Sequence, residues 1–211
     1  MRRLVMKMSI SADGFVGGSN GEIDWLFRSA DEGTTGWVVD TVWRAGLHIM
    51  GSRTFQDMVA YWPGSTEVFA QPMNEIPKAV FTRQKDFRID PAHSTTALRE
   101  ARDFRGIKQP DTPPELGNWR EAEIVTGDLA SEIARLKSQP GKDILAHGGA
   151  GFMRSLVALD LVDEYRLLVH PVVLGRGLGI FSDIAAPRPL ELVETAVFKS
   201  GAVATVYRRA S

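Results

Sequence analysis

The stretch DILAHGGAGFM, residues 143–153, decides how the chain folds. An apolar run leads directly into the turn Gly148-Gly149-Ala150-Gly151, and an amphipathic run, FMRSLVAL, follows it. This order predicts a buried strand, a tight turn and a helix. Such a turn leaves backbone N–H groups unpaired at the helix N-terminus, where the helix dipole favours a phosphate or a pyrophosphate. Glycines here can also serve close packing alone, so the rest of the chain must decide.

Composition indicates an ordinary globular protein and excludes several classes of site. The 211 residues suit one domain, and 44% of them are hydrophobic. A net charge of −1 argues against a nucleic-acid or polybasic membrane partner, and the absence of cysteine excludes disulfides, thiolate metal sites and a cysteine nucleophile. No apolar run reaches the roughly 18 residues of a membrane span, and the N-terminus does not match a signal peptide. We expect a cytoplasmic protein.

Strand and helix patterns alternate along the chain, which predicts a mostly parallel sheet with helices on both faces. The expected strands are 3–11, 47–50, 78–82, 122–126, 143–147 and 162–173, and the expected helices are 35–45, 54–62, 97–104, 129–138 and 152–160. Two last strands, 190–200 and 202–208, predict an antiparallel hairpin around Gly201. Residues 84–119 hold four prolines among scattered charges, and we interpret them as an irregular insertion or long loop within one domain, 1–211.

Two local interactions are expected within the helices. Asp40 and Arg44 have the i,i+4 spacing of an ion pair on one helix face. Ser52 or Thr54 can cap the helix that follows the strand 47–50.

The loops 11–25, 51–54, 82–84 and 148–152 all follow strand ends, so a parallel sheet gathers them at one edge, where ligands bind. The turn 51–54 adds a second helix N-terminus, the guanidinium of Arg53 and two hydroxyls. Arg83 follows the end of another strand. Two phosphate-type turns and a separate arginine suit a dinucleotide with an additional phosphate, which favours NADP over NAD. Taken singly, each arginine would more commonly belong to a surface salt bridge, and only the set of features favours the dinucleotide.

Other ligand motifs are absent. No G-x-G-x-x-G opens the first strand and no G-x-x-x-x-G-K-[ST] occurs, which argues against an ordinary Rossmann dehydrogenase and a P-loop protein. The histidines lack the spacing of zinc ligands, so no metal site is expected. His48 and His170 lie within strands and are expected in the core, whereas His147 precedes the glycine turn and is expected to contact a nucleotide through its backbone.

Several short motifs follow one another along nearly the whole chain, apart from about 84–119: SISADGF (9–15), GSRTF (51–55), TR (82–83), LK with PGKDI (136–144), GGA (148–150) and LGRG (174–177). With these motifs the chain resembles the dihydrofolate-reductase-like family. More narrowly, it is similar to stand-alone relatives of the reductase domain of the bacterial riboflavin-biosynthesis deaminase/reductase, the C-terminal domain of RibD. The resemblance implies a three-layer α/β/α fold with an antiparallel C-terminal edge, and NADPH as hydride donor.

The resemblance also implies roles for individual residues. The turns 51–54 and 148–152 would hold the pyrophosphate, Arg83 would sit at the 2′-phosphate, and the loop 12–21 would close over the nicotinamide. A cis peptide is implied at Gly148-Gly149. The complete set expected to bind cofactor is Ile10, Ala12, Gly17, Gly51, Ser52, Arg53, Thr54, Thr82, Arg83, His147, Gly148, Gly149, Ala150, Gly151 and Phe152.

Two departures limit the resemblance. The acidic residue that fixes the pterin in dihydrofolate reductases falls near Thr35, and Asp31 or Glu32 reaches that position only with a shifted alignment. This argues against folate as the substrate. The H-x-E and P-C-x-x-C motifs of the deaminase half are missing, which excludes the bifunctional enzyme.

The leading hypothesis is therefore NADPH-dependent reduction of a small pterin-like, aminouracil-like or conjugated carbonyl substrate. Asp13, Asp24 and Trp25 are the candidate catalytic residues, with Asp31 as a further proton donor, since Trp25 can form a flat apolar wall beside the carboxylate of Asp24. Asp13 alternatively serves only to fasten its loop, as Asp-Gly turn pairs do. The alternatives are an NADP(H)-binding sensor without turnover and a scaffold that binds nothing. The resemblance, together with the apolar run 162–173 and the terminal hairpin, favours a homodimer.

Overall fold

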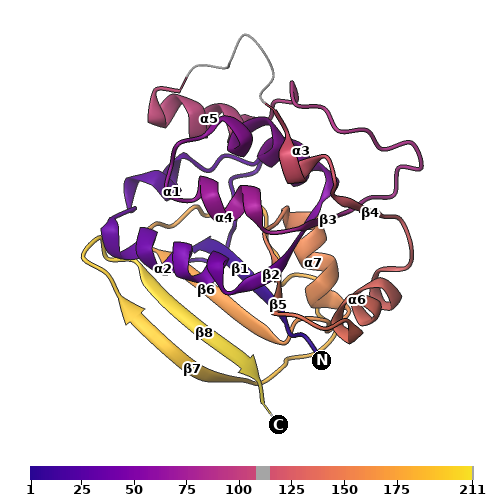
Figure 1. Cartoon of the computed structure of the whole chain (residues 1–211). Coiled ribbons are helices and arrows are strands. Elements are labelled where there is room, and N and C mark those ends of the chain that lie inside the picture. Colours follow the sequence, from indigo (N-terminus) through magenta and orange to yellow (C-terminus); the bar gives the residue numbers. More distant parts are fainter. Residues whose placement is uncertain (108–114, 211) are drawn as a thin grey trace.

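The computed structural model describes residues 1–107 and 115–210, which are built around an eight-stranded sheet (Figure 1). The order across the sheet is β4-β3-β2-β5-β1-β6-β8-β7. All neighbours from β4 to β6 are parallel, whereas β8 is antiparallel to both β6 and β7. The strands are β1 (Leu4–Ser11), β2 (Ala45–Gly51), β3 (Lys78–Phe81), β4 (Glu123–Val125), β5 (Asp143–Ala146), β6 (Glu164–His170), β7 (Leu190–Val197) and β8 (Val203–Arg209). The predicted mostly parallel sheet with an antiparallel C-terminal edge is confirmed.

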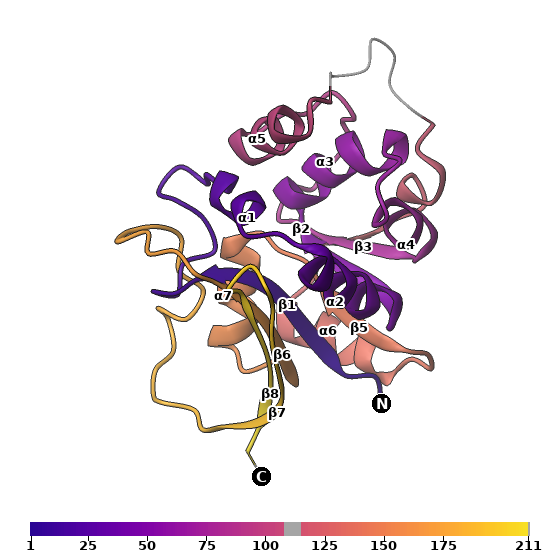
Figure 2. The same ribbon diagram turned by 90° about the vertical axis from the view of Figure 1, so that its left-hand side faces the viewer.

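Helices cover both faces of the sheet, as the alternating pattern predicts. The α-helices are α1 (Asp24–Arg28), α2 (Glu32–Trp43), α3 (Ser52–Tyr61), α4 (Ala70–Glu75), α5 (Thr96–Arg105), α6 (Leu129–Ser138) and α7 (Ala150–Ala158), with short 3-10 turns η1 (Trp62–Gly64) and η2 (Gly117–Trp119). Figure 2 shows α2, α3 and α4 on one side of the sheet and α7 on the other. The expected three-layer α/β/α arrangement is confirmed, with one core on each face of the sheet.

The alternation of side chains along β1 explains how this central strand serves two cores. Leu4, Met6 and Ile10 are buried in the core that α6 and α7 complete. Val5 is buried in the second core, beneath α2, α3 and α4. Each such aliphatic side chain contributes about 1.5–3 kcal/mol when it is fully buried. Because alternate residues of a strand share a face, Lys7 points to the same side as Val5.

The structure corrects several predicted boundaries. Helix α2 begins at Glu32 rather than at residue 35, because Asp31 and Thr34 form a reciprocal capping box. The predicted caps of α3 by Ser52 or Thr54 are wrong: Gly51 is the N-cap residue and has no side chain that could accept a hydrogen bond. The short helices α1 and α4 were not predicted.

The predicted ion pair between Asp40 and Arg44 is not formed among the residues that the structure describes. Strand β2 begins directly after this helix, at Ala45, with a register shift before Leu47. Arg44 therefore lies at the junction of the helix and the strand rather than inside the helix.

Two later regions agree more closely with the sequence. The predicted strand-like run 162–173, which Pro171 interrupts, forms the shorter β6 and ends at His170, because Pro171 cannot donate a ladder hydrogen bond. Gly201, at a φ of +83°, turns the terminal hairpin as expected. Within 84–119 the expected helix is present as α5, while residues 108–114 lie outside the described part of the chain. In that described part, no helix has both the length and the apolar character to cross a membrane.

Candidate functional site

The carboxyl ends of the parallel strands bring the predicted loops to one edge of the sheet. Strand β5 lies between β2 and β1, so its glycine turn sits between the loops that follow those two strands. The N–H of Gly51 donates to the carbonyl of Gly148 over 3.1 Å, and the N–H of His147 donates to that of Ile49 over 3.1 Å. The two strand-to-helix turns predicted to bind phosphate are therefore direct neighbours.

The glycines of the two turns allow a close approach. A Cβ atom at Gly149 would lie 2.8 Å from Oγ1 of Thr54, and one at Gly51 would lie 3.1 Å from Cβ of Phe152. Gly148 has a φ of +132°, and its peptide bond to Gly149 is cis, as the resemblance implies. Close packing is thus a real role of these glycines, and it places the N-termini of α3 and α7 against each other.

Neither of these helix N-termini is capped by a side chain. Gly51 and Gly149 are the N-cap residues of α3 and α7, and neither makes a side-chain cap hydrogen bond. The first-turn N–H groups of residues 52–54 and 150–152 are consequently free of helical partners. Two positive ends of helix dipoles meet here, which makes a suitable environment for an anion.

Arg53 and Arg83 both lie at this edge with exposed side chains. Within the described residues, neither of them takes part in an ion pair, so the alternative role in a surface salt bridge is not realised there. Thr82 is buried, and its hydroxyl accepts a hydrogen bond from the N–H of Gln84 over 3.1 Å. This contact fixes the turn that carries Arg83.

The loop after β1 is fastened to the segment 172–179. The carboxylate of Asp13 accepts hydrogen bonds from the hydroxyl of Ser11 at 2.6 Å and from the N–H of Gly175 at 2.7 Å. These hydrogen bonds, chiefly that from Ser11, lower the pKa of Asp13. The carbonyl of Gly17 accepts from the N–H of Leu178, and no Cβ would fit at Gly177, 2.2 Å from that oxygen. These contacts correspond to the alternative considered for Asp13, a residue that fastens its loop.

The Asp24–Trp25 pair lies at the start of α1. The carboxylate of Asp24 is paired with Arg28 at 2.6 Å, on the exposed surface. Trp25 is only 6% exposed, and its indole N–H donates to the carbonyl of Glu22. The ring stands edge-on to His170, with 5.5 Å between centroids. The ring of Trp25 therefore packs in the interior against His170, whereas the side chain of Asp24 faces solvent.

At the end of β1, two residues of the set expected to bind cofactor differ in exposure, since Ile10 is buried and Ala12 is exposed. Glu100, which the sequence analysis did not single out, reaches this region from α5. Its carboxylate accepts hydrogen bonds from the N–H groups of Ile23 and Asp24, the latter over 3.0 Å. The segment 84–119 thus supplies the N-terminal cap of α1.

The sequence analysis also missed a group of basic side chains beneath α2 and α3, here called the histidine–lysine cluster: Lys7, His48, His147 and His170. The rings of His48 and His147 meet edge to face, with 4.3 Å between centroids. His48, which is fully buried as predicted, has no hydrogen-bond partner for either ring nitrogen among the described residues. Nδ1 of His170 lies 2.6 Å from the hydroxyl of Ser29.

Burial lowers the pKa of every side chain in this cluster. It lowers the pKa of His48 to about 3 and that of His170 to about 4, and it lowers the pKa of His147 well below its ordinary value. The three imidazoles are therefore neutral at pH 7. Burial also lowers the pKa of Lys7, to about 8, so this amine is still mostly protonated there.

Lys7 has no carboxylate partner within the described residues, and its Nζ donates only a long hydrogen bond, of 3.5 Å, to the hydroxyl of Ser9. A partly exposed cation without a counter-ion is suited to bind an electronegative atom or to donate a proton. The available signal in the sequence was a lysine in the middle of a strand whose flanking residues, Met6 and Met8, are apolar. Among the described residues, no cluster of three potential ligands could hold a metal ion.

Comparison with known proteins agrees with this geometry. Residues 2–204 match the family described as the RibD C-terminal domain. YyaP of Bacillus subtilis (strain 168), an uncharacterized protein, is 32% identical over 98% of this chain and 94% of its own length. A putative riboflavin biosynthesis protein from Shewanella sp. PV-4 has the same fold, with a TM-score of 0.69 at 18% identity over 99% of both chains. Dihydrofolate reductase from Enterococcus faecalis, solved with NADP(H), has a TM-score of 0.56 at 12% identity, covering 99% of this chain and 97% of that one. The chain has a reductase-like fold and belongs to the RibD C-terminal domain family.

Proposed function

We propose that this protein is an NADPH-dependent reductase that transfers a hydride to a small pterin-like or aminouracil-like heterocycle or to a conjugated carbonyl compound. The observation that carries the proposal is the pair of uncapped N-termini of α3 and α7, packed together through Thr54 and Gly149. Two such termini suit the two phosphates of a pyrophosphate. Membership of the family, and the fold shared with a reductase solved with NADP(H), support the same cofactor.

Each part of NADPH has residues of matching chemistry. The turns 51–54 and 148–152 offer backbone N–H groups to the pyrophosphate. Arg83, held by the turn at Thr82, offers its guanidinium to the 2′-phosphate that distinguishes NADPH from NADH. The nicotinamide would lie at the end of β1, beside Ile10, Ala12 and Gly17.

We assign proton delivery to Lys7. When bound, NADPH supplies a hydride, and the substrate atom that gains negative charge then needs a proton. The carboxylates of Asp13 and Asp24 are already engaged, by backbone N–H groups and by Arg28. Nζ of Lys7 carries a proton at neutral pH and has no carboxylate partner in the described part of the chain. It gives that proton to the substrate and recovers one from solvent, while Trp25 and Ser29 hold the neighbouring His170 in place.

Cofactor titration tests the proposal. We expect NADPH fluorescence to change on binding, with a Kd well below about 1 mM, and NADH to bind at least about tenfold more weakly. Replacing Arg83 by alanine should remove most of that preference, because only NADPH carries the 2′-phosphate. Arg99→Ala, at an exposed position on α5, is the matched control and should leave both affinities unchanged. If neither NADPH nor NADH binds, the proposed reductase activity is rejected.

A cofactor-binding sensor without turnover is the second candidate, and one observation favours it. Asp31, one of the two carboxylates close in sequence to the pterin-binding position of dihydrofolate reductases, is used as a helix cap. It accepts hydrogen bonds from the N–H groups of Thr34 and Ser200, which lower its pKa to about 2. A sensor would bind NADPH but would not oxidise it with pterins, aminouracils or dicarbonyl compounds, and absorbance of the reduced nicotinamide distinguishes the two functions.

We also propose that the chain acts as a homodimer and forms one domain over residues 1–211. The edge strand β7 is exposed along its length, and the exposed fractions of its Leu192, Val193 and Val197 are 53%, 44% and 77%. Apolar side chains on an open edge strand are commonly covered by a partner. Sedimentation at several concentrations tests the dimer, and the cytoplasmic location stays a prediction.

A further inference from the structure

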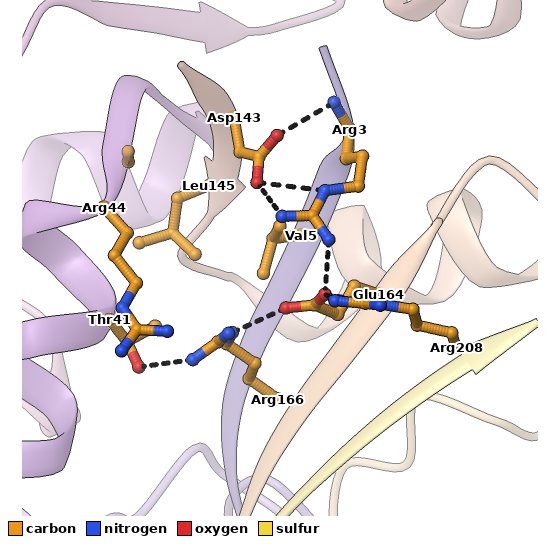
Figure 3. Close-up of a pocket in the computed structure, with 10 residues that line it drawn as sticks. Arg3, Val5, Thr41, Arg44, Asp143, Leu145, Glu164, Arg166 and Arg208 are labelled. Atoms are coloured by element: carbon orange, nitrogen blue, oxygen red, sulfur yellow. Dashed lines mark hydrogen bonds and ion pairs between the residues drawn. The ribbon is translucent and has the colours of Figure 1, made fainter. Parts of the chain in front are cut away.

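A second polar site lies at the opposite end of the sheet from the glycine turns. Arg3 precedes β1, Asp143 and Glu164 begin β5 and β6, and the antiparallel β8 brings Arg208 to the same end. Together with Arg44 and Arg166 these residues line a cavity of about 220 Å³ (Figure 3). We call this cavity the arginine pocket. Because the strands are parallel, their amino ends place it away from the candidate cofactor site.

The charges in the arginine pocket are not balanced. Four guanidinium groups face two carboxylates, so the lining carries an excess of two positive charges. The side chain of Glu164 is completely buried and accepts hydrogen bonds from Arg166 at 2.7 Å and from Arg3 and Arg208 at 2.9 Å each. Asp143 is bound by Arg3, whose Nε lies 3.1 Å from its carboxylate. Both carboxylates are therefore already committed to other arginines.

Arg44 carries the unpaired charge. Its expected partner Asp40 does not bind it, and across the described ranges it takes part in no ion pair. Figure 3 shows its guanidinium beside Thr41, turned toward that of Arg166. Arg166 itself donates to the hydroxyl of Thr41 over 3.4 Å. Two like charges thus face each other around a hydroxyl, an arrangement that an anion between them would stabilise.

We propose that the arginine pocket binds a small oxyanion, a phosphate or a carboxylate group, between Arg44 and Arg166. Guanidinium groups offer planar pairs of N–H donors that match the oxygens of both anions. The volume is below the roughly 300–1,000 Å³ typical of sites for drug-sized molecules, so the ligand is of the size of a free anion or a small acid. The hydroxyl of Thr41 provides one further polar contact.

The presence of Arg44 in the arginine pocket is not explained by a role in holding the strand ends together. The ion pairs of Arg3, Arg166 and Arg208 with the two carboxylates already connect β1, β5, β6 and β8. Arg44 adds only positive charge to this network. The site is independent of the proposed reductase activity, since none of its residues belongs to the turns that would hold NADPH.

Calorimetric titration of the whole protein with inorganic phosphate, at constant ionic strength, tests the proposal. Saturating NADPH is present throughout to occupy the turns 51–54 and 148–152, and a second series uses Arg83→Ala to detect phosphate bound at the proposed 2′-phosphate position. We expect saturable binding that Arg44→Gln weakens at least about tenfold. Arg99→Gln, on the exposed side of α5, should bind like the wild type. A parallel titration with acetate distinguishes a carboxylate ligand from a phosphate.

Arg44 is exposed and unpaired, so its replacement should leave folding intact, which circular dichroism checks. An affinity for phosphate and acetate that is the same in wild type and Arg44→Gln would overturn the proposal. So would a loss of self-association without any change in anion affinity, because that result would make the pocket a contact for a second copy. Failure of NADPH to bind would reject the reductase and leave this test unaffected.

Discussion

The two ends of the parallel sheet differ in how far their polar groups are paired within the protein. At the carboxyl end, the backbone N–H groups of α3 and α7 are left without caps, and the neighbouring imidazoles are neutral. At the amino end, charged side chains surround the completely buried carboxylate of Glu164. The first arrangement leaves hydrogen-bonding capacity free for a ligand, whereas the second uses most of it within the protein.

This difference predicts where stability and where binding are concentrated. Removing one partner from a buried ion network leaves uncompensated charges, which is strongly destabilising. Groups at a ligand site contribute less to folding, because their partners are absent until the ligand binds. Substitutions at the amino end should therefore lower the free energy of unfolding most. Substitutions at the carboxyl end should chiefly change cofactor binding and the local dynamics of the loops.

The largest effect is expected for Glu164→Gln. Burial alone would raise the pKa of Glu164, but hydrogen bonds from Arg166 and Arg208 keep this pKa below its usual value, so the group is ionised at pH 7. Its neutralisation leaves three arginines facing one another and should lower the free energy of unfolding by about 3–5 kcal/mol. Urea denaturation measures this change. Glu194→Gln, on exposed β7, is the control, and an equal effect of both variants would contradict a special role for the amino-end network.

A smaller effect is expected from acidification, through the histidine–lysine cluster. Burial, with Lys7 nearby, lowers the pKa of His170 to about 4 in the folded state, whereas an unfolded chain has about 6.5. The unfolded state therefore binds a proton first as the pH falls, and stability is lost between about pH 6.5 and pH 4. For His170 alone the free energy of unfolding should fall by about 2 kcal/mol between pH 7 and pH 5.

Urea denaturation at the two pH values measures that loss, and His170→Gln should reduce the difference between them by about the same amount. Titration of the ring signals of His170 by NMR is an independent check. A ring that titrates near the unfolded value would show that the imidazole is not protected by the fold, and the imidazole of His170 could then no longer be counted as neutral in the comparison of the two ends.

Much of the fold was predictable because its signals are local. The apolar run 143–147 and the glycine turn after it specify a buried strand and a helix, and β5 and α7 were predicted within a few residues. The terminal hairpin was predicted from Gly201 for the same reason. The early start of α2 was missed because its capping box uses Thr34 where the usual pattern has Glu or Gln.

The candidate site was predictable only in part, because side-chain clusters depend on strand order. The turns at 51–54 and 148–152 were expected at one edge, and they are in contact there. Their part in cofactor binding stays a prediction. The histidine–lysine cluster arises because β5 is inserted between β2 and β1, which no local pattern indicates. The position of Arg44 likewise follows from the start of β2 at Ala45, not from helical spacing.

Gly149→Ala should have a moderate effect, because the new methyl group would lie 2.8 Å from Oγ1 of Thr54. Some rotation of Thr54 can relieve the contact, so we expect a loss of about 1–2 kcal/mol in the free energy of unfolding. The same substitution in a Thr54→Ala background should cost less, and this double-mutant cycle isolates the contact. Gly151→Ala is the control, since its Cβ meets no atom within 4 Å. Additive effects of the two substitutions would show that the turns are not mechanically coupled.

The smallest effect is expected for Asp13→Ala, and it should be local. The carboxylate of Asp13 joins the loop after β1 to the N–H groups of Leu174 and Gly175. Its removal should speed hydrogen exchange of these two amides by about tenfold while the exchange of β1 is unchanged, because only a loop contact is lost. If Asp13 only fastens the loop, Asp13→Asn, which keeps one acceptor oxygen, should restore part of the protection and retain NADPH oxidation. Normal exchange combined with complete loss of NADPH oxidation in both variants would instead make Asp13 a catalytic residue, and the carboxyl end would then depend on a carboxylate as well as on its free backbone N–H groups.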